Sequence, residues 1–256
     1  YFQKYQVTVP MEKETAQILV FPDGPVFKAY TLWPNLIQTC RTPPEGLNGP
    51  LIDGGYGTLS DLTQGAQKAN VSIADSIVLL RFNSQKNWLN AAKLGAKAIL
   101  FVEPVESTRV EAEAKFAVTP IYLPRLYVPG FAGQTLYNYA NGTVISIKSM
   151  IVYETVEAKN VIGIIRGSQY PDDIVVFSAY FDSWSIVPWL SPGADEACGV
   201  ATLLELVKFF AQHPPLRTVM FVAFSGHWQA LTGAREFVES FFFHDSVVKG
   251  EKKMWM

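Results

Sequence analysis

Apolar runs of strand length alternate with a helical pattern in the second half of the chain. Three such runs occupy residues 159–166, 173–179 and 217–224. The last of them is apolar throughout, which predicts a strand buried on both faces. Ala197–Gln212 repeats its apolar residues at helical spacing and ends before Pro214, which cannot continue a helix. This alternation predicts an α/β layered domain over residues 151–256.

The end of the chain continues the same pattern. A second helix is predicted over Gly233–Phe243, and Lys253–Met256 has the composition of the beginning of another strand. We therefore expect the α/β domain to be incomplete at Met256 and to continue in a longer protein.

The first half of the chain has a different organisation. Residues 46–150 are predicted to form a small β-rich unit around one strand–helix–strand segment, in which Ser76–Phe82 and Lys97–Val102 are the strands. Prolines and glycines before this unit separate it from residues 1–45, an irregular segment that we assign to the core of the α/β domain. A single sheet running through both regions would contradict this division.

Composition narrows the class of protein. The chain has 256 residues, of which 49% are hydrophobic and 17% charged, enough for two domains with apolar cores. A net charge of −2 gives no electrostatic reason to expect nucleic acid. No apolar run approaches the roughly 18 residues that cross a bilayer. Cys40 and Cys198 are predicted to be free thiols, and Cys198, one turn into the predicted helix, is expected to be a small buried residue. Asn70 and Asn141 are acceptors for glycosylation only in a compartment that glycosylates.

Candidate chemistry lies at the ends of the predicted strands. In a parallel sheet, ligands bind outside the carboxyl ends of the strands. Three such stretches can be identified, Ala179–Trp184, Pro192–Gly199 and Phe224–Gly233. They carry the candidate residues Tyr180, Asp182, Asp195, His227 and Trp228.

These stretches resemble the zinc-dependent exopeptidase family. That family includes bacterial aminopeptidases, glutamate carboxypeptidase and the non-enzymatic transferrin receptor, with nicastrin in a related branch. The resemblance rests on Asn160–Gly163, Ala179–Trp184, Pro192–Val200, Arg217–Phe224 and Gly233–Arg235. Residues 46–150 are similar to the protease-associated domain inserted in many members. The resemblance implies a three-layer α/β core, truncated at its C-terminus, with a small β-rich protease-associated domain.

The resemblance also implies that the metal site is degenerate. Family members hold two zinc ions with His, a bridging Asp, Glu, Asp and His, and use a second Glu as general base. The first His falls on Tyr180, whose phenol is a poor zinc ligand at neutral pH. The base and the Glu ligand fall on His227 and Trp228, and the last two ligands would lie beyond Met256. Asp195 alone keeps a ligand position, so we expect no bound metal and no catalytic residue.

Each candidate has a second interpretation. His227 is either a replacement base or ligand, or a polar residue in a strand-to-helix turn, and we favour the turn. Asp195 either contacts an ion or, as we favour, caps the following helix, and Asp182 is expected to be held by neighbouring amides. The aromatic residues around the former site either line a ligand pocket or fill the vacated cavity, the interpretation that close packing favours. They are Tyr180, Trp184, Trp189 and Trp228.

Two functions follow from these interpretations. The first is an inactive, extracytoplasmic or cell-surface domain of a membrane-anchored protein, which acts in binding or scaffolding and has a protein or peptide partner. Its membrane contact would come from segments outside this chain. The second is an active zinc metallo-aminopeptidase or carboxypeptidase with an atypical site. Metal content separates the two, because only the second needs zinc.

Overall fold

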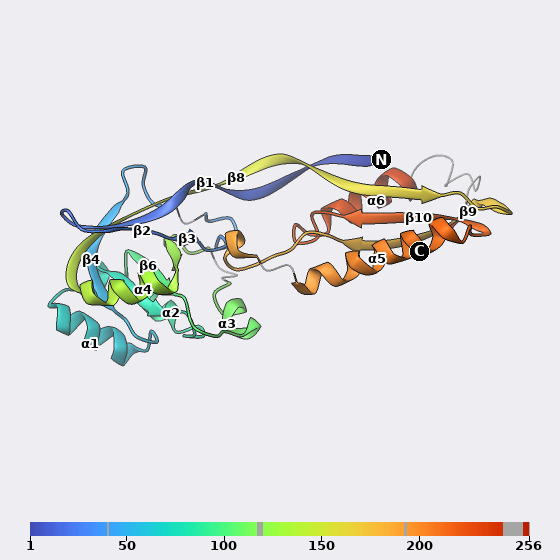
Figure 1. Ribbon diagram of the computed structural model, residues 1–256. Coiled ribbons are helices and arrows are strands. Elements are labelled where there is room, and N and C mark those ends of the chain that lie inside the picture. The colour runs from blue at the N-terminus through green and yellow to red at the C-terminus, as the bar shows by residue number, and fades with distance from the viewer. Residues whose placement is uncertain (40, 117–119, 192–193, 243–252, 256) are drawn as a thin grey trace. The chain divides into compact units, whose positions relative to one another are not determined.

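The computed structural model describes residues 1–39, 41–116, 120–191, 194–242 and 253–255 (Figure 1). Contacts within the chain divide it into two compact units. Unit 1 comprises Tyr1–Val9, Glu154–Trp184 and Pro192–Met256, and unit 2 comprises Pro10–Tyr153 and Ser185–Ser191. Among the described residues, no helix is both long enough and apolar enough to cross a membrane.

Unit 1 contains the predicted α/β domain. Its strands pair in the order β11 (Lys253–Trp255), β9 (Tyr170–Tyr180), β10 (Arg217–Phe224) and the end of β8 (Asn141–Ile165). β9 is parallel to both β11 and β10, whereas β8 is antiparallel to β10. The residues of β10 from Thr218 to Val222 are buried, which confirms the prediction of a central strand.

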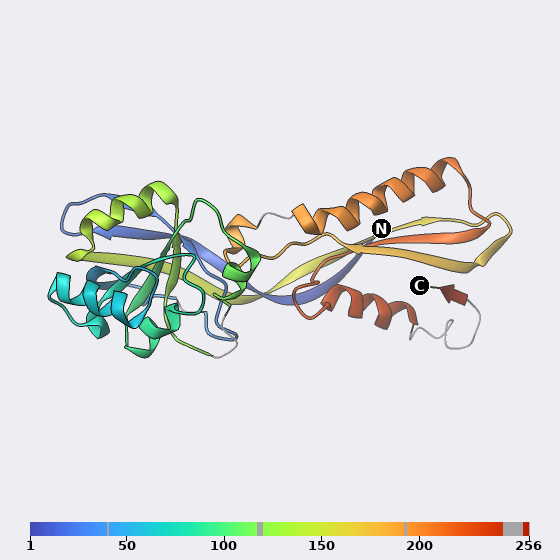
Figure 2. The ribbon, with the colours of Figure 1, turned by 90° about the horizontal axis from the view of Figure 1, so that it is seen from below.

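Two helices cover opposite faces of this sheet. Val219 and Phe221 of β10 pack in one cluster with the helix α5 (Ala194–Gln212). Met220 and Val222, which point to the other face, pack with α6 (Thr232–Phe242), where Phe237 is buried. Figure 2 shows α5 and α6 on either side of the strands. The three-layer arrangement expected of the core is therefore present.

The apolar stripe predicted on α5 is narrower than its sequence indicates. Leu203 is buried, but Leu204 is 57% exposed. Cys198, which its small size and position near the start of the helix led us to expect in the core, is also exposed. Helical spacing alone overestimated the buried face because apolar residues occupy nearly the whole circumference of α5.

Unit 2 is built on a parallel sheet of four strands. In spatial order these are β4 (Leu47–Asp53), β5 (Ile77–Arg81), β6 (Ala98–Val102) and β7 (Arg125–Val128). The remaining elements are β1 (Phe2–Val20), which begins in unit 1, β2 (Val26–Lys28), β3 (Tyr30–Thr31), the first part of β8, α1 (Leu59–Ala69), α2 (Trp88–Lys93), α3 (Arg109–Glu113), α4 (Gly130–Leu136), and the short 3-10 helices Ile73–Asp75, Tyr137–Tyr139 and Pro188–Leu190. The predicted strand–helix–strand segment is present as β5, α2 and β6.

One face of this sheet is covered by α4 and β1. Ala132 and Leu136 of α4 share a buried cluster with residues of β5, β6 and β1, including Leu79 and Leu100. The backbone of α4 approaches β6 so closely that a Cβ atom on Gly133 would lie 2.4 Å from Cγ1 of Val102. Glycine is therefore needed at this point of the helix.

The structure corrects the predicted domain boundaries. Residues 10–45, assigned to the core from the sequence, belong to unit 2, as do residues 185–191. β8 pairs with β4 near its beginning and with β10 at its end, so strand pairing is continuous from β11 to β3. The expected pair of separate sheets is therefore wrong. The physical reason is that no proline or glycine interrupts the chain between Gly142 and Gly163.

Candidate functional site

The site lies at the carboxyl ends of two adjacent parallel strands in unit 1. The register of β9 and β10 places Tyr180 opposite Phe224, the last residues of the two strands. The amide of Phe181 donates to the carbonyl of Phe224 at 2.9 Å and holds the two ends together. The residues that follow, 181–184 and 225–228, are therefore neighbours, as the position of ligand sites in parallel sheets predicts.

Aromatic rings meet at these strand ends. The Tyr180 ring stacks on the His227 imidazole with 3.9 Å between ring centroids and 18° between planes. Trp228 meets both rings edge-on, at 6.3 Å from Tyr180 and 5.0 Å from His227. Trp184 lies 6.0 Å from Trp228 in a tilted arrangement. We call these four residues the aromatic cluster.

Asp182 supports the turn that carries His227. Its Oδ2 accepts a hydrogen bond from the backbone amide of His227 at 2.9 Å. This agrees with the prediction that neighbouring amides hold Asp182. Its Oδ1 is buried and has no hydrogen-bond partner within the described residues. Burial raises the pKa of the Asp182 carboxyl above its ordinary value, and the hydrogen bond from His227 opposes part of that increase.

A buried asparagine holds the turn from the other side. Asn160 is fully buried; its Oδ1 accepts from the amide of Ser225 at 3.2 Å, and its Nδ2 donates to the carbonyl of Gly233 at 2.7 Å. The hydroxyls of Tyr5 and Ser225 form a further hydrogen bond of 2.7 Å. Neither Tyr5 nor Asn160 was expected at the site from the sequence. A polar residue within the apolar run at 159–166 was the only signal for Asn160.

The aromatic cluster leaves little space beside it. A cavity of about 160 Å³ is lined by Ser178, Tyr180, Phe224, His227 and Leu231, among others. Ligand pockets usually enclose about 300–1,000 Å³. The rings therefore fill most of the space at the strand ends, and what remains is smaller than an ordinary ligand site.

The structure brings together four of the five candidate residues. Tyr180, Asp182, His227 and Trp228 lie at one place, and Trp184 joins them. Asp195 belongs to α5, but its side chain is outside the described part of the structure, so its role as a cap stays a prediction. Trp189 belongs to unit 2 and is 63% exposed.

Comparison with known sequences identifies the region that contains the site. Residues 160–250 match the sequence model of Peptidase family M28. This part of the chain is therefore similar to peptidase family M28. The resemblance to zinc-dependent exopeptidases is therefore confirmed at the level of the family, and we call residues 160–250 the M28 region.

Curated relatives match parts of the chain. A glutamate carboxypeptidase 2 homolog of Caenorhabditis elegans is 32% identical over 123 residues, which are 44% of this chain and 15% of that protein. A probable zinc metalloprotease of Pyrenophora teres is 35% identical over 91 residues, 34% of this chain and 20% of that protein. A vacuolar membrane protease of Laccaria bicolor is 39% identical over 84 residues, 32% of this chain and 8% of that protein. These matches span at most one fifth of each relative.

Solved structures share the fold. A zinc aminopeptidase from Bacillus subtilis superposes with a TM-score of 0.62 and 19% identity, over 97% of this chain and 56% of that one. An aminopeptidase from Aneurinibacillus superposes with a TM-score of 0.51 and 18% identity, over 99% of this chain and 59% of that one. The expected peptidase-like α/β fold is confirmed, and at this identity the likeness concerns the fold alone.

The described side chains do not fit a two-zinc centre. Zinc in proteins takes imidazole, carboxylate or thiolate ligands. Among the described side chains at these two strand ends there is one imidazole, His227, packed against Tyr180, and one carboxylate, Asp182, which already accepts from the His227 amide. The indole of Trp228 has no lone pair for a metal. Nowhere among the described residues do three His, Cys, Asp or Glu side chains come close enough together to hold an ion.

Proposed function

We propose that the M28 region is a non-catalytic exopeptidase-like domain that acts in binding or scaffolding. The stack of Tyr180 on His227 carries this proposal. These residues occupy the strand ends where the resemblance to exopeptidases assigns a zinc ligand and the general base. A phenol–imidazole stack supplies neither a carboxylate base nor a normal zinc ligand at the Tyr180 position.

The surroundings of the stack support the same proposal. Trp228 fills the position where a carboxylate ligand would be required, and its buried Nε1 can only donate. Loss of a positioned general base alone typically costs about 10²–10⁴ in rate. Loss of the metals would also remove the activated water. We propose that the domain uses neither zinc nor another cofactor.

The partner and location are further parts of this proposal. We propose a protein or peptide partner, and an extracytoplasmic or cell-surface location within a protein anchored by segments outside this chain. The names of two matched relatives, vacuolar membrane proteases of Schizophyllum commune and Laccaria bicolor, favour a membrane context. We also propose that residues 46–150 form a protease-associated domain, because their strand–helix–strand segment resembles that domain.

The second candidate function is an active zinc metallo-aminopeptidase or carboxypeptidase with an atypical site. Two observations favour it. Matched relatives are named as proteases, and His227 keeps an imidazole at the site, where it stacks on Tyr180. In this alternative, His227 would serve as a replacement ligand or base.

Metal content and peptide hydrolysis test the two functions together. The complete natural protein is dialysed against zinc at micromolar concentration, and then analysed for bound metal and for turnover of aminopeptidase and carboxypeptidase substrates. We expect no tightly bound zinc, and turnover at the level of a His227→Gln variant. Two zinc ions per chain, or turnover that a chelator and His227→Gln both abolish, would establish the second candidate instead.

A further inference from the structure

A cavity in unit 2 lies at the carboxyl edge of its parallel sheet. Its volume is about 310 Å³, within the range of small-ligand sites. Residues at the ends of β5 and β6, including Arg81 and Glu103, line it together with Tyr56 after β4 and Tyr137 after α4. Open α/β sheets bind ligands at this edge. The site at Tyr180 and His227 belongs to unit 1, so the two are independent.

Arg81 presents a positioned positive charge to this cavity. Its guanidinium lies 5.3 Å from the centre of the Tyr56 ring and 5.7 Å from that of Tyr137. No carboxylate among the described residues lies within ion-pair distance of it. The backbone of Arg81 also donates to the carbonyl of Gly55 at 2.9 Å, which holds Tyr56 beside it. The rings orient the guanidinium and leave its N–H groups available for a carboxylate.

Tyr137 adds a polar group without a partner. Its hydroxyl is buried and makes no hydrogen bond within the described residues. Buried hydroxyls are nearly always hydrogen-bonded in folded proteins. A ligand oxygen bound at Arg81 would give this hydroxyl an acceptor, because Tyr137 and Arg81 line the same cavity.

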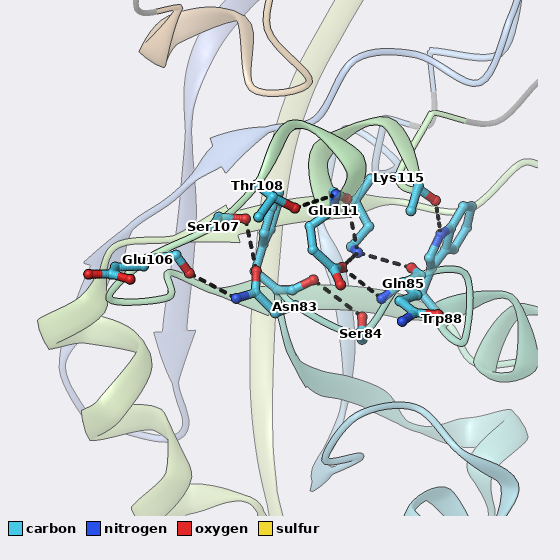
Figure 3. Close-up of polar contacts among 11 residues, drawn as sticks. Asn83, Ser84, Gln85, Trp88, Glu106, Ser107, Thr108, Glu111 and Lys115 are labelled. Atoms are coloured by element: carbon cyan, nitrogen blue, oxygen red, sulfur yellow. Dashed lines mark hydrogen bonds and ion pairs between the residues drawn. The ribbon is translucent and has the colours of Figure 1, made fainter.

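Negative charge lines another part of the cavity. Glu103 is engaged, since its Oε2 accepts from the amide of Gly130 at 2.7 Å. Glu106 is fixed through its backbone, whose carbonyl accepts from Nδ2 of Asn83 at 2.8 Å, while Ser107 donates to Oδ1 of the same asparagine. Figure 3 shows these bonds between the loop and Asn83. The carboxylate of Glu106 has no partner among the described residues and stays available.

The charges disfavour two simpler ligands. An anion without a positive group would be attracted by Arg81 but repelled by Glu103 and Glu106. A cation without a negative group would meet Arg81, which already occupies the faces of Tyr56 and Tyr137. A ligand that carries both charges matches the lining.

We propose that this cavity binds a small zwitterion of the α-amino acid or dipeptide class. Its carboxylate would pair with Arg81 and accept from the Tyr137 hydroxyl. Its ammonium group would pair with Glu106. The cavity would thus recognise both termini of a free amino acid or short peptide.

Calorimetric titration of the whole chain with L-leucine and glycyl-L-leucine tests the proposal. We expect at least one probe to bind, and N-acetyl-L-leucine and L-leucinamide, which each lack one charge, to bind at least about tenfold more weakly. Arg81→Gln should reduce the affinity for the zwitterion about tenfold or more. Arg81→Lys, which keeps the charge but not the planar guanidinium, should reduce this affinity by a smaller factor.

Matched controls separate the cavity from general charge effects. Arg109→Gln removes an exposed arginine of α3 that pairs with Glu113, and should leave affinity unchanged. Glu106→Gln should weaken the binding of the zwitterions and abolish the preference of the cavity for them over N-acetyl-L-leucine. The proposal is overturned if neither zwitterion binds at about 10 mM, if Arg81→Gln behaves like Arg109→Gln, or if the blocked probes bind as tightly as the zwitterions.

Discussion

Tyr180 and His227 stack nearly parallel, with 3.9 Å between their ring centroids. They come from the ends of neighbouring parallel strands, where the resemblance to exopeptidases places a zinc ligand and the general base. An aromatic pair of this kind contributes about 0.5–1.5 kcal/mol beyond the area it buries. The contact therefore stabilises the strand ends at the place where an active enzyme would need exposed donors.

Restoring the expected donors should destabilise the protein without restoring activity. We predict that the free energy of unfolding of the triple variant Tyr180→His, His227→Glu, Trp228→Glu is about 2–4 kcal/mol lower than that of the parent. The variant loses ring packing and brings a carboxylate into a partly buried position. Thermal melting with and without zinc, together with peptide hydrolysis, measures both effects. An active triple variant that zinc stabilises would show that only the donors had been lost.

A variant that conserves the ring is the control for this experiment. Tyr180→Phe keeps the ring that stacks on His227 and should change the free energy of unfolding by less than about 1 kcal/mol. Its melting curve therefore distinguishes loss of the aromatic contact from loss of the phenol hydroxyl. A Tyr180→Phe variant as unstable as the triple variant would contradict packing as the cause.

Asp182→Asn should stabilise the protein more at neutral pH than at acid pH. Burial raises the pKa of Asp182 in the folded state. The contribution of such a group is fully present below the pKa of the unfolded chain, about 4, and is lost as pH rises through the higher folded pKa. Asparagine does not ionise, and its Oδ1 can still accept from the His227 amide. The gain in melting temperature over the parent should therefore increase from pH 3 to pH 7.

An exposed aspartate on the same strand serves as the reference. Asp172 of β9 is exposed, and Asp172→Asn should give no comparable increase between pH 3 and pH 7. A stabilisation by Asp182→Asn that is constant with pH, or that is larger at pH 3, would show that the buried charge is not its cause.

The sequence predicts unit 1 well because its signals are local. The apolar run of β10 and the proline stop after α5 lie within a few residues of the features they define. The strand-end rule also brought Tyr180, Asp182, His227 and Trp228 together correctly. The bonds that hold this turn were not predictable, since Tyr5 reaches Ser225 across 220 positions and Asn160 reaches Gly233 across 73.

The boundary expected near residue 150 lies close to the division of the two units between Tyr153 and Glu154. The sequence did not show that one strand, β8, crosses this boundary from Asn141 to Ile165. The side chains of a strand do not determine how far it extends. The length of β8 follows from its pairing with β4 and β10. Trp189 was likewise placed near the site by sequence proximity alone, and belongs to unit 2.

Unit 2 contains a buried ion pair, and removing its carboxylate should lower the free energy of unfolding more than removing its lysine. Lys115 is fully buried; its Nζ lies 3.2 Å from Oε2 of Glu111 and donates to the carbonyl of Gln85 at 3.0 Å (Figure 3). Glu111→Gln leaves a buried ammonium without its counter-ion and should cost about 2 kcal/mol or more. Lys115→Met places an apolar chain between Phe82 and Phe101 but leaves the Glu111 carboxylate without its counter-ion. That carboxylate is 16% exposed and still accepts from the amide of Gln85 at 2.8 Å, so this variant should cost less than Glu111→Gln.

Urea denaturation of these two variants and their combination measures the coupling. Because both single changes act on one pair, the double variant should be more stable than the sum of the single effects predicts. Strictly additive effects, or a Lys115→Met variant less stable than Glu111→Gln, would contradict the assignment of the cost to an unpaired buried charge.

Gly233→Ala should destabilise the turn that carries His227, although alanine favours helices. A Cβ atom at Gly233 would lie 2.1 Å from the carbonyl oxygen of Ser225 and 2.5 Å from Oδ1 of Asn160. Neither atom can move freely, since Asn160 Oδ1 accepts from the amide of Ser225. We expect overpacking of about 1–3 kcal/mol to exceed the roughly 1 kcal/mol that alanine gains in a helix.

Gly163→Ala in β8 is the matched control, because no atom lies within 4 Å of its Cβ position. Urea denaturation should show a lower midpoint for Gly233→Ala and an unchanged or higher one for Gly163→Ala; equal midpoints would show that the close approach at Gly233 does not constrain the turn.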